Sequence, residues 1–433
     1  MRESLVIKCD IINSLAVRLT LVRSVSNPPT LGLKECIKDL LGERGFAYIA
    51  KAKELRAAGK DVISFGVGQP DIPTFDHIVE EGIKALKERF TGYTETQGIK
   101  ELRAAIAEYL NERYGSDVRE DEVLVTIGTK GAAFLALAAY LKPGDEVIVP
   151  EPTYPVYSEA PKFIGAKPVY IPLKWEGEDK GFSLDIEKIE KTISSKTKAL
   201  VVNNPHNPTG AIFKPAELEA LMDLARKHNL VVFVDEIYDN FVYEEGTFKS
   251  FMEFPDWRDY VIYLNGFSKT FSMTGWRVGY LVTRSDVVRN LTKLAVNIWS
   301  CPPSMAQRAA IAALKGDWKP VRNMVNLFRE RRDIMVAELR KVPGFEVWRS
   351  AGAFYVFPRV RRLLDDIGMN VEEFVDYLID SKYVVTLPGT AFPDIAGKDY
   401  MRFSFCISKS RIIEGAKRIK DAVEDLLASR SKR

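Results

Sequence analysis

The sequence predicts an α/β fold whose mainly parallel sheet is covered by helices, together with a smaller α+β region. Strand-like hydrophobic runs alternate with helical patterns up to about residue 319, which is typical of a parallel sheet buried on both faces. After that point short strands lie between long helices. A length of 433 residues is too great for one simple core and also favours more than one domain.

Along the first part of the chain, a helix is expected over about residues 47–58. The expected strands are short runs rich in β-branched residues, over 122–126, 146–149, 168–173, 199–202, 230–234 and 261–264. Helical patterns separate them, including an Ala/Leu-rich segment that ends near residue 141 and the segment 215–228.

The smaller region begins with a long charged helix, expected over residues 320–341. Short strands over 354–357 and 384–387 follow, and a helix over 411–428 closes the chain. Residues 61–65 are strand-like and are expected to join this region rather than the larger sheet.

Composition excludes several classes of protein. With 62 basic and 59 acidic residues the formal net charge is +3, which gives no reason to expect a nucleic-acid partner. The four cysteines and three histidines lack the spacing of a disulfide framework or a metal site, so we expect no bound metal and a reducing, cytoplasmic environment. No apolar run approaches the roughly 20 residues that span a bilayer, and residues 1–30 are expected to be an extension rather than a signal peptide.

The most informative segment covers residues 265–277, directly after a predicted strand. Open α/β sheets bind their ligands at the carboxyl ends of strands, and this segment places Lys269 and Arg277 there among small, hydroxyl and aromatic residues. A lysine in such a place can act as an amine nucleophile, and a nearby arginine can hold a phosphate. The alternative is two solvated cations on a loop, and the flanking aromatic residues weigh against it.

Three further segments follow other predicted strands. Asp235 ends the hydrophobic strand over 230–234, where a carboxylate can pair with a protonated ring nitrogen, and Tyr238 lies close by; an ordinary helix-capping Asp is the alternative. Two prolines and a glycine force a turn that presents Asn207 as a fixed amide. Gly128 opens a helix whose N-terminus can bind an anion, although this signal is weak alone.

Taken in this order and with these gaps, the four segments resemble the class I and II aminotransferases of pyridoxal phosphate fold type I. The resemblance is closest to archaeal sequences of the aspartate aminotransferase subgroup, with its NPTG and SKT…GWR motifs, and it runs from about Phe65 to the C-terminus. It implies a large domain with a seven-stranded, mainly parallel sheet. The implied boundaries are an arm over 1–34, small-domain segments over 35–70 and 319–433, and the large cofactor-binding domain over 71–318.

The resemblance also implies roles for individual residues. Lys269 would bind pyridoxal 5′-phosphate as a Schiff base and later move the substrate proton, Asp235 would pair with the ring nitrogen, and Tyr238 would hydrogen-bond the phenolic oxygen, which makes these three the catalytic residues. The other implied cofactor ligands surround the ring and the phosphate: Gly128, Thr129, Lys130, Tyr154, Asn207, Ser268, Arg277 and, from the partner subunit of a homodimer, Tyr93. The implied substrate ligands are Gly68, Tyr154, Asn207 and Arg402, the last for the α-carboxylate. Many relatives carry Ser where this chain has Gly266, so Ser268 is expected to contribute to phosphate binding instead.

The function expected from this resemblance is ping-pong transfer of an amino group between an L-amino acid and a 2-oxo acid. Aspartate and 2-oxoglutarate are the expected substrates, on subgroup resemblance only, because no residue stands out as a ligand for a second carboxylate. An aromatic or broad-specificity aminotransferase and, more distantly, a C–S lyase on the same fold stay open. A transcription regulator with an aminotransferase-like domain is disfavoured, because the extension before Phe65 is short and contains no basic recognition helix.

Overall fold

The computed structural model of the chain describes residues 35–40, 42, 44–392 and 396–430. The chain divides into two units, residues 1–40 and 41–433. In the first unit the described helix is α2 (Glu35–Asp39). The predicted arm over residues 1–34 lies outside the described residues, and the following description concerns the second unit.

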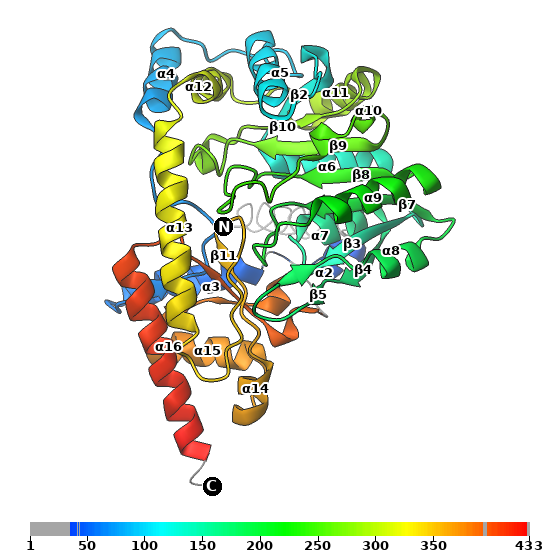
Figure 1. The fold of residues 1–433 in the computed structure, drawn as a ribbon. Helices are drawn as coiled ribbons and strands as arrows, with labels where there is room; N and C mark the ends of the chain where they lie inside the picture. The colour runs from blue at the N-terminus through cyan, green and yellow to red at the C-terminus, as the bar shows by residue number, and fades with distance from the viewer. Residues whose placement is uncertain (1–34, 41, 43, 393–395, 431–433) are drawn as a thin grey trace, which may run out of the picture. The chain divides into compact units, whose positions relative to one another are not determined.

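A seven-stranded sheet forms the centre of this unit, in the order β2-β10-β9-β8-β7-β3-β4 (Figure 1). Neighbouring strands are parallel except β10, which is antiparallel to both β2 and β9. The strands are β2 (Val123–Thr126), β3 (Glu146–Glu151), β4 (Lys167–Pro172), β7 (Thr197–Asn203), β8 (Val231–Asp235), β9 (Val261–Gly266) and β10 (Gly279–Val282). The mainly parallel seven-stranded sheet that the sequence predicts is confirmed.

Strand β10 is the one strand of this sheet that the sequence analysis did not identify. It covers only four residues and begins two residues after Arg277. A run this short shows no recognisable alternation of apolar and polar side chains. Thr283, just beyond it, donates from its side chain to the carbonyl of Val261, 3.1 Å away, which ties the end of β10 to the start of β9. The other predicted strands agree with the structure to within one or two residues at most of their ends.

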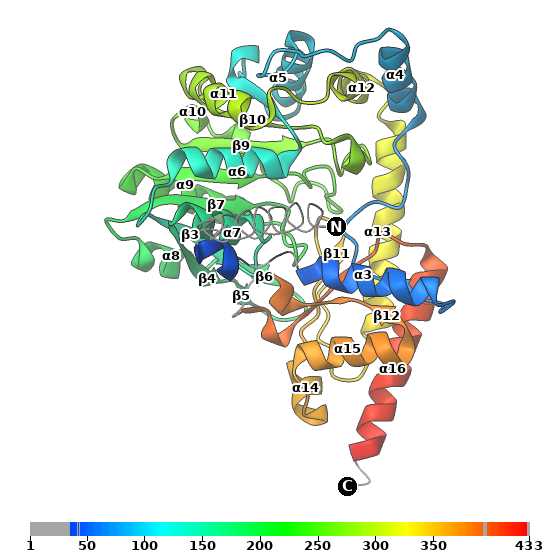
Figure 2. The ribbon, with the colours of Figure 1, turned by 180° about the vertical axis from the view of Figure 1, so that it is seen from behind.

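Helices cover both faces of the sheet, because successive side chains on each strand point to opposite sides. On β8, Val232 and Val234 belong to one buried cluster, whereas Phe233 belongs to the other. The face of Phe233 is covered by α6 (Thr129–Tyr140), α7 (Val156–Ile164) and α11 (Ser285–Trp299), of which α6 lies in front of the strands in Figure 2. The opposite face is covered by α5 (Lys100–Tyr114), α8 (Ile186–Thr192), α9 (Pro215–His228), α10 (Trp257–Tyr260) and α12 (Ser304–Lys315), and α4 (Asp76–Lys87) packs on α12.

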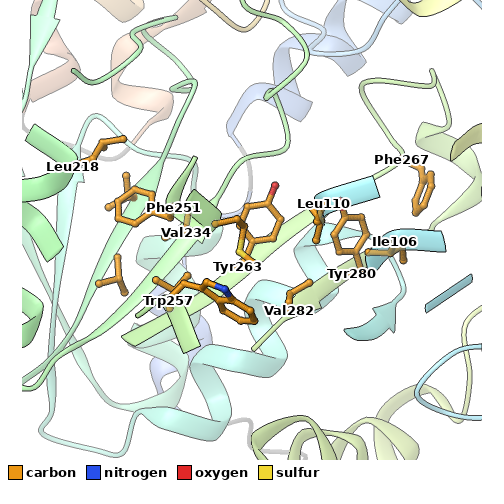
Figure 3. Packing of buried hydrophobic residues seen from close by; sticks show 14 of the residues in the cluster. Ile106, Leu110, Leu218, Val234, Phe251, Trp257, Tyr263, Phe267, Tyr280 and Val282 are labelled. Carbon is orange, nitrogen blue, oxygen red and sulfur yellow. The ribbon is translucent and has the colours of Figure 1, made fainter. Parts of the chain in front are cut away.

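Figure 3 shows part of this second cluster from close by. Tyr263 and Tyr280, from neighbouring strands, extend toward Leu110 of α5, and Trp257 lies beside Val282. Large apolar side chains therefore fix the helices against the sheet at a distance from the strand ends where the chemistry-bearing residues lie.

The remaining elements surround a second core. The helices are α3 (Arg44–Ala57), α13 (Lys319–Leu339), α14 (Arg361–Ile367), α15 (Val371–Lys382) and α16 (Lys409–Arg430). The short strands are β1 (Ile63–Ser64), β11 (Tyr355–Val356), β12 (Val384–Val385), β13 (Leu387–Pro388) and β14 (Met401–Ser404). A separate hairpin is formed by β5 (Lys174–Trp175) and β6 (Phe182–Ser183). No described helix is long and apolar enough to cross a membrane.

One strand of the second core was predicted wrongly. The strand expected over residues 384–387 is two strands, because β12 pairs with β1 and β13 pairs with β14 in a different sheet. Between them the Thr386 hydroxyl donates to the carbonyl oxygen of Arg402, 2.7 Å away. The pairing of β1 with β12 brings residues 63–64 to the C-terminal elements, while the domain boundaries at residues 70 and 318 stay predictions.

Phe328 provides a test of this second core. Its side chain is fully buried and contacts the rings of Phe241, Phe354 and Phe405, so it joins α13 to the short strands. We expect Phe328→Ala to lower the free energy of unfolding by about 3–5 kcal/mol, measured by chemical denaturation. Ile413→Ala, at an exposed position of α16, is the control and should change it by about 0.5 kcal/mol or less. Equal losses in the two variants would contradict this account of the core.

Candidate active site

A cavity of about 410 Å³ lies at the carboxyl ends of the parallel strands, and its far wall comes from the second core. All but two of the residues that the sequence singled out line it: Gly68, Thr129, Lys130, Tyr154, Asn207, Asp235, Tyr238, Ser268, Lys269, Arg277 and Arg402. The exceptions are Gly128, which immediately precedes the lining residue Thr129, and Tyr93, which is 89% exposed on a loop. One pocket therefore gathers side chains that are far apart in the sequence.

Lys269 follows β9 and extends its amine into this cavity. Its Nζ donates to the carbonyl oxygen of Gly68, 2.7 Å away, and lies 5.8 Å from the centre of the Phe354 ring. Burial, reinforced by the positive charges of Arg402 and other pocket cations, lowers the pKa of Lys269 to about 8. About a tenth of the amine is therefore neutral and nucleophilic at pH 7, far more than for an ordinary lysine.

Asp235 ends the central strand β8, and its carboxylate is buried at the base of the cavity. Burial raises the pKa of Asp235 to about 6, although the hydrogen bonds from Tyr157 and from the Ile237 backbone oppose the rise. The Tyr157 hydroxyl donates to Oδ2 at 2.6 Å, and the Ile237 N–H donates to Oδ1 at 3.1 Å. These bonds hold the carboxylate in one orientation, and at neutral pH it is an anion beneath the pocket.

The turn after β7 is fixed to the same strand end. Asn203 donates from its side chain to the carbonyl oxygen of Asp235 at 2.9 Å, and its own side-chain oxygen accepts from the Asn207 backbone N–H at 2.8 Å. Asn207 is thereby presented to the cavity, as the Pro/Gly pattern predicts. The neighbouring His206 does not line the cavity. Its side chain is buried, its Nδ1 lies 2.8 Å from the Thr209 hydroxyl, and burial lowers its pKa to about 3.

An anion-binding end of the cavity lies at the N-terminus of α6. Gly128 is the N-terminal cap residue of this helix, so its first N–H groups are available to a ligand. The Arg277 guanidinium is placed beside them, donating to the carbonyl oxygens of Ile127 at 3.3 Å and Thr274 at 2.9 Å. Ser268 lines the same cavity. This end combines a helix N-terminus and a guanidinium, which are suitable for binding a phosphate.

The surroundings of Gly266 leave no room for a serine side chain at this position. A Cβ at this residue would lie 2.7 Å from Oγ1 of Thr129 and 2.9 Å from the Gly279 Cα, and the second of these is backbone. Because Thr129 already donates to the Asn265 carbonyl at 3.0 Å, the Thr129 side chain occupies the space that a serine side chain would need.

Arg402 reaches the cavity from β14 and is only 5% exposed. Its Nη2 donates to the Gly66 carbonyl at 2.7 Å and its Nη1 to the side-chain oxygen of Asn207 at 3.2 Å, while Nε has no hydrogen-bond partner. Within the described part of the chain it makes no ion pair with a carboxylate. A buried guanidinium without a counter-ion indicates that an anionic ligand group completes its surroundings.

Comparison with known proteins agrees with this geometry. Residues 60–419 match the family model described as aminotransferase class I and II. The aspartate aminotransferase of Sulfurisphaera tokodaii is 47% identical over 387 residues, which cover 89% of this chain and 96% of that protein. The chain belongs to the class I and II aminotransferases.

Further relatives support the same assignment for this aminotransferase. The aspartate aminotransferase of Sulfolobus acidocaldarius is 45% identical, over 90% of this chain and 96% of that protein. The solved structure of an alanine aminotransferase from Pyrococcus furiosus superposes with a TM-score of 0.84 at 33% identity, covering 91% of this chain and all of that one. The fold is that of the pyridoxal phosphate enzymes of fold type I, as the motifs predict.

Among the lining side chains that sequence reasoning missed, three contact the predicted site residues directly. Tyr157 is the hydroxyl donor to Asp235, and Tyr355 and Phe392 lie against Arg402, with ring centres 4.4 and 4.7 Å from its guanidinium carbon. Tyr355 occurs within an apolar stretch that reads as ordinary core, and Phe392 occurs in a short loop-like stretch next to a proline. Tyr157 could have been suspected from its place one helical turn after Tyr154, but no local signal distinguishes Tyr355 or Phe392.

The lowered pKa of Lys269 can be measured on the protein without added cofactor. We expect trinitrobenzenesulfonate to modify Lys269 with a half-maximal rate at about pH 8, because the amine loses its proton as the pH rises through that value. Free Nα-acetyl-lysine, added to the same reaction as a reference amine, should require a pH of about 10.4. Peptide mapping by mass spectrometry follows the modification of Lys269 alongside it. A midpoint for Lys269 equal to that of the free amine would contradict the assigned environment.

Proposed function

We propose that Lys269 binds pyridoxal 5′-phosphate and that the enzyme transfers the amino group of L-aspartate to 2-oxoglutarate in two half-reactions. The observation that supports this most strongly is that one cavity holds a lysine with a lowered pKa, a buried carboxylate and a guanidinium that pairs with no carboxylate of the described residues. An amine nucleophile, a partner for a cationic ring and a receptor for a carboxylate are the three functions that an amino-acid transaminase needs.

The donor set fits this cofactor. A buried carboxylate such as Asp235 is stabilised by a cationic partner, and a protonated pyridine ring nitrogen is of suitable size and charge. The helix N-terminus at Thr129, with Arg277 and Ser268, suits the phosphate. Tyr154 offers a flat surface to the ring, and Tyr238 and Asn207 offer hydrogen bonds to its phenolic oxygen.

When bound, pyridoxal phosphate supplies an aldehyde that condenses with amines and a ring that accepts the electron pair released at the substrate Cα. The chain's own residues would then control protons and orientation. Asp235, ionised above about pH 6, would keep the ring nitrogen protonated. The Lys269 amine, with a pKa of about 8, would be a base of suitable strength for removing the substrate Cα proton and returning it. Arg402 binds the α-carboxylate and so fixes which face of the substrate meets Lys269.

A dicarboxylic substrate needs a second cation, and Lys130 is the candidate. Its side chain lines the cavity together with those of Lys269, Arg277 and Arg402, for which other roles are proposed. Its Nζ lies 5.2 Å from the centre of the Tyr154 ring, on the large-domain wall. The names of the two relatives that are 45–47% identical also favour aspartate. The alanine aminotransferase among the solved neighbours makes alanine the informative comparison substrate.

A homodimer is part of the proposal. Tyr93, which the family resemblance assigns to the phosphate of the partner subunit, is 89% exposed and lies outside the cavity of its own chain. An exposed tyrosine at that place is available to a second copy of the chain. The amino acid and the 2-oxo acid are the small-molecule partners.

Absorbance spectroscopy tests the cofactor proposal. We expect the purified protein, after incubation with pyridoxal phosphate and gel filtration, to retain an absorbance band near the visible edge that L-aspartate converts to the pyridoxamine form. Lys269→Ala should lose or alter the band because it lacks the amine, whereas Lys198→Ala, at an exposed site, should behave as wild type. Absence of any band in the wild-type protein would refute the proposal, and a band unmoved by aspartate would refute the substrate but not the cofactor.

Substitution of Lys130 tests the dicarboxylate proposal. Lys130→Met keeps the length of the side chain and the backbone N–H but removes the charge. We expect the KM for aspartate to rise by about tenfold to a hundredfold, as for loss of a hydrogen bond to a charged group, while the KM for alanine changes little. Steady-state kinetics with both substrates gives the comparison. An equal rise in KM for both substrates would contradict this role and indicate that Lys130 interacts with the cofactor phosphate instead.

A further inference from the structure

Tyr355 contacts both Tyr238, which we propose binds the cofactor, and Arg402, which we propose binds the substrate carboxylate. It lies on β11, where it pairs with Ser404 of β14, and Arg402 is two residues away on that same strand. The side chain is almost fully buried, yet it lines the cavity. A large aromatic side chain at this place has one surface in the second core and one in the active site.

The ring of Tyr355 forms one side of a clamp on Arg402. Its centre lies 4.4 Å from the guanidinium carbon, and the Phe392 ring lies 4.7 Å from the same atom. The two protein hydrogen bonds of Arg402, to Gly66 and Asn207, hold two of its nitrogens at fixed acceptors. Aromatic faces stabilise a buried cation and restrict rotation of its plane, so the group that receives a substrate carboxylate is oriented in advance.

The hydroxyl of Tyr355 makes a different contact. It lies 2.9 Å from the Tyr238 hydroxyl, and the two rings meet edge to face at 5.8 Å. It also lies 2.3 Å from the place that a Cβ on Gly68 would take, so only glycine permits this approach. The Gly68 carbonyl in turn accepts the hydrogen bond from Lys269. The charged and titratable groups that face the tyrosine pair are Arg402, Tyr154 and Cys406.

We propose that Tyr355 is a positioning residue with two separable roles: its ring fixes the plane of Arg402 for the substrate carboxylate, and its hydroxyl donates to Tyr238 so that the Tyr238 proton points into the pocket. The inference rests on the proposed function, because the acceptor in the pocket is then the phenolic oxygen of the cofactor. A hydroxyl that accepts a hydrogen bond becomes a stronger donor itself, so Tyr355 strengthens the contact that Tyr238 makes with that oxygen.

Two substitutions separate the roles. Tyr355→Phe keeps the ring and removes the hydroxyl, whereas Tyr355→Leu removes both. The matched control is Tyr243→Phe, since Tyr243 is a buried tyrosine of the same core whose hydroxyl donates to the Ala353 backbone carbonyl, and it does not line the cavity. Phe392→Leu removes the other ring of the clamp.

Two readouts are measured on the cofactor-loaded proteins, and neither depends on turnover. One is the Kd of succinate, a dicarboxylate that cannot react, by calorimetry. The other is the pH midpoint of the cofactor absorbance change. We expect Tyr355→Phe to raise the midpoint by about half a pH unit and to leave the Kd unchanged. Tyr355→Leu should also raise the Kd by about tenfold, and Phe392→Leu should raise the Kd alone.

The outcomes that overturn the inference are distinct. If Tyr355→Phe has the same midpoint as Tyr243→Phe, the hydroxyl has no positioning role. If Tyr355→Leu binds succinate as wild type does, the ring has none; should that variant fail to fold, Phe392→Leu decides the same point. A wild-type protein without the absorbance band would instead refute the cofactor proposal, and one that does not bind succinate would refute the dicarboxylate proposal.

Discussion

The active site depends on the burial of the Asp235 carboxylate at the end of the central strand. A carboxylate in this place loses most of its hydration, and burial raises its pKa to about 6. The Tyr157 hydroxyl and the Ile237 N–H hold the carboxylate in position without neutralising it, and the Asn203 side chain holds the backbone carbonyl of the same residue. At neutral pH the site thus contains a buried anion with which a cationic ring could pair, and the neighbouring strand ends carry the other groups that we propose for such a ligand.

The second core supplies residues of the cavity that do not come from the parallel sheet. Arg402 and Tyr355 come from its short strands, and Gly66 and Gly68 follow β1, which pairs with β12. The half of the cavity formed by the second core is therefore joined to the half formed at the strand ends through contacts such as Lys269 with Gly68 and Tyr238 with Tyr355. A movement of the second core would change the position of Arg402 relative to Lys269, which connects the packing of the fold to the substrate orientation that we propose.

Much of the fold and of the site follows from local patterns. The strands that end in Asp235 and before Lys269 are hydrophobic runs with abrupt polar ends, and parallel strands bring such ends to one edge. The failures have equally local causes. Strand β10 is too short to show alternation, and the split between β12 and β13 at Thr386 is decided by two different partner strands. Pairing partners are a property of the whole chain, which a window of sequence does not contain.

The sequence by itself determined the family: the ordered motifs that contain Gly128, Asn207, Asp235 and Lys269 indicate an aminotransferase of this fold before any contact is known. Only the tertiary structure decided which neighbours surround those residues and Arg402. Tyr157 is far from Asp235 in the sequence, Tyr355 lies in an apolar run that resembles any core, and nothing in the local sequence of Phe392 indicates that it contacts Arg402. The physical reason is that burial sets the pKa of a lysine and contact with neighbouring rings sets the plane of a guanidinium. Both conditions arise only when separate segments of the chain pack together.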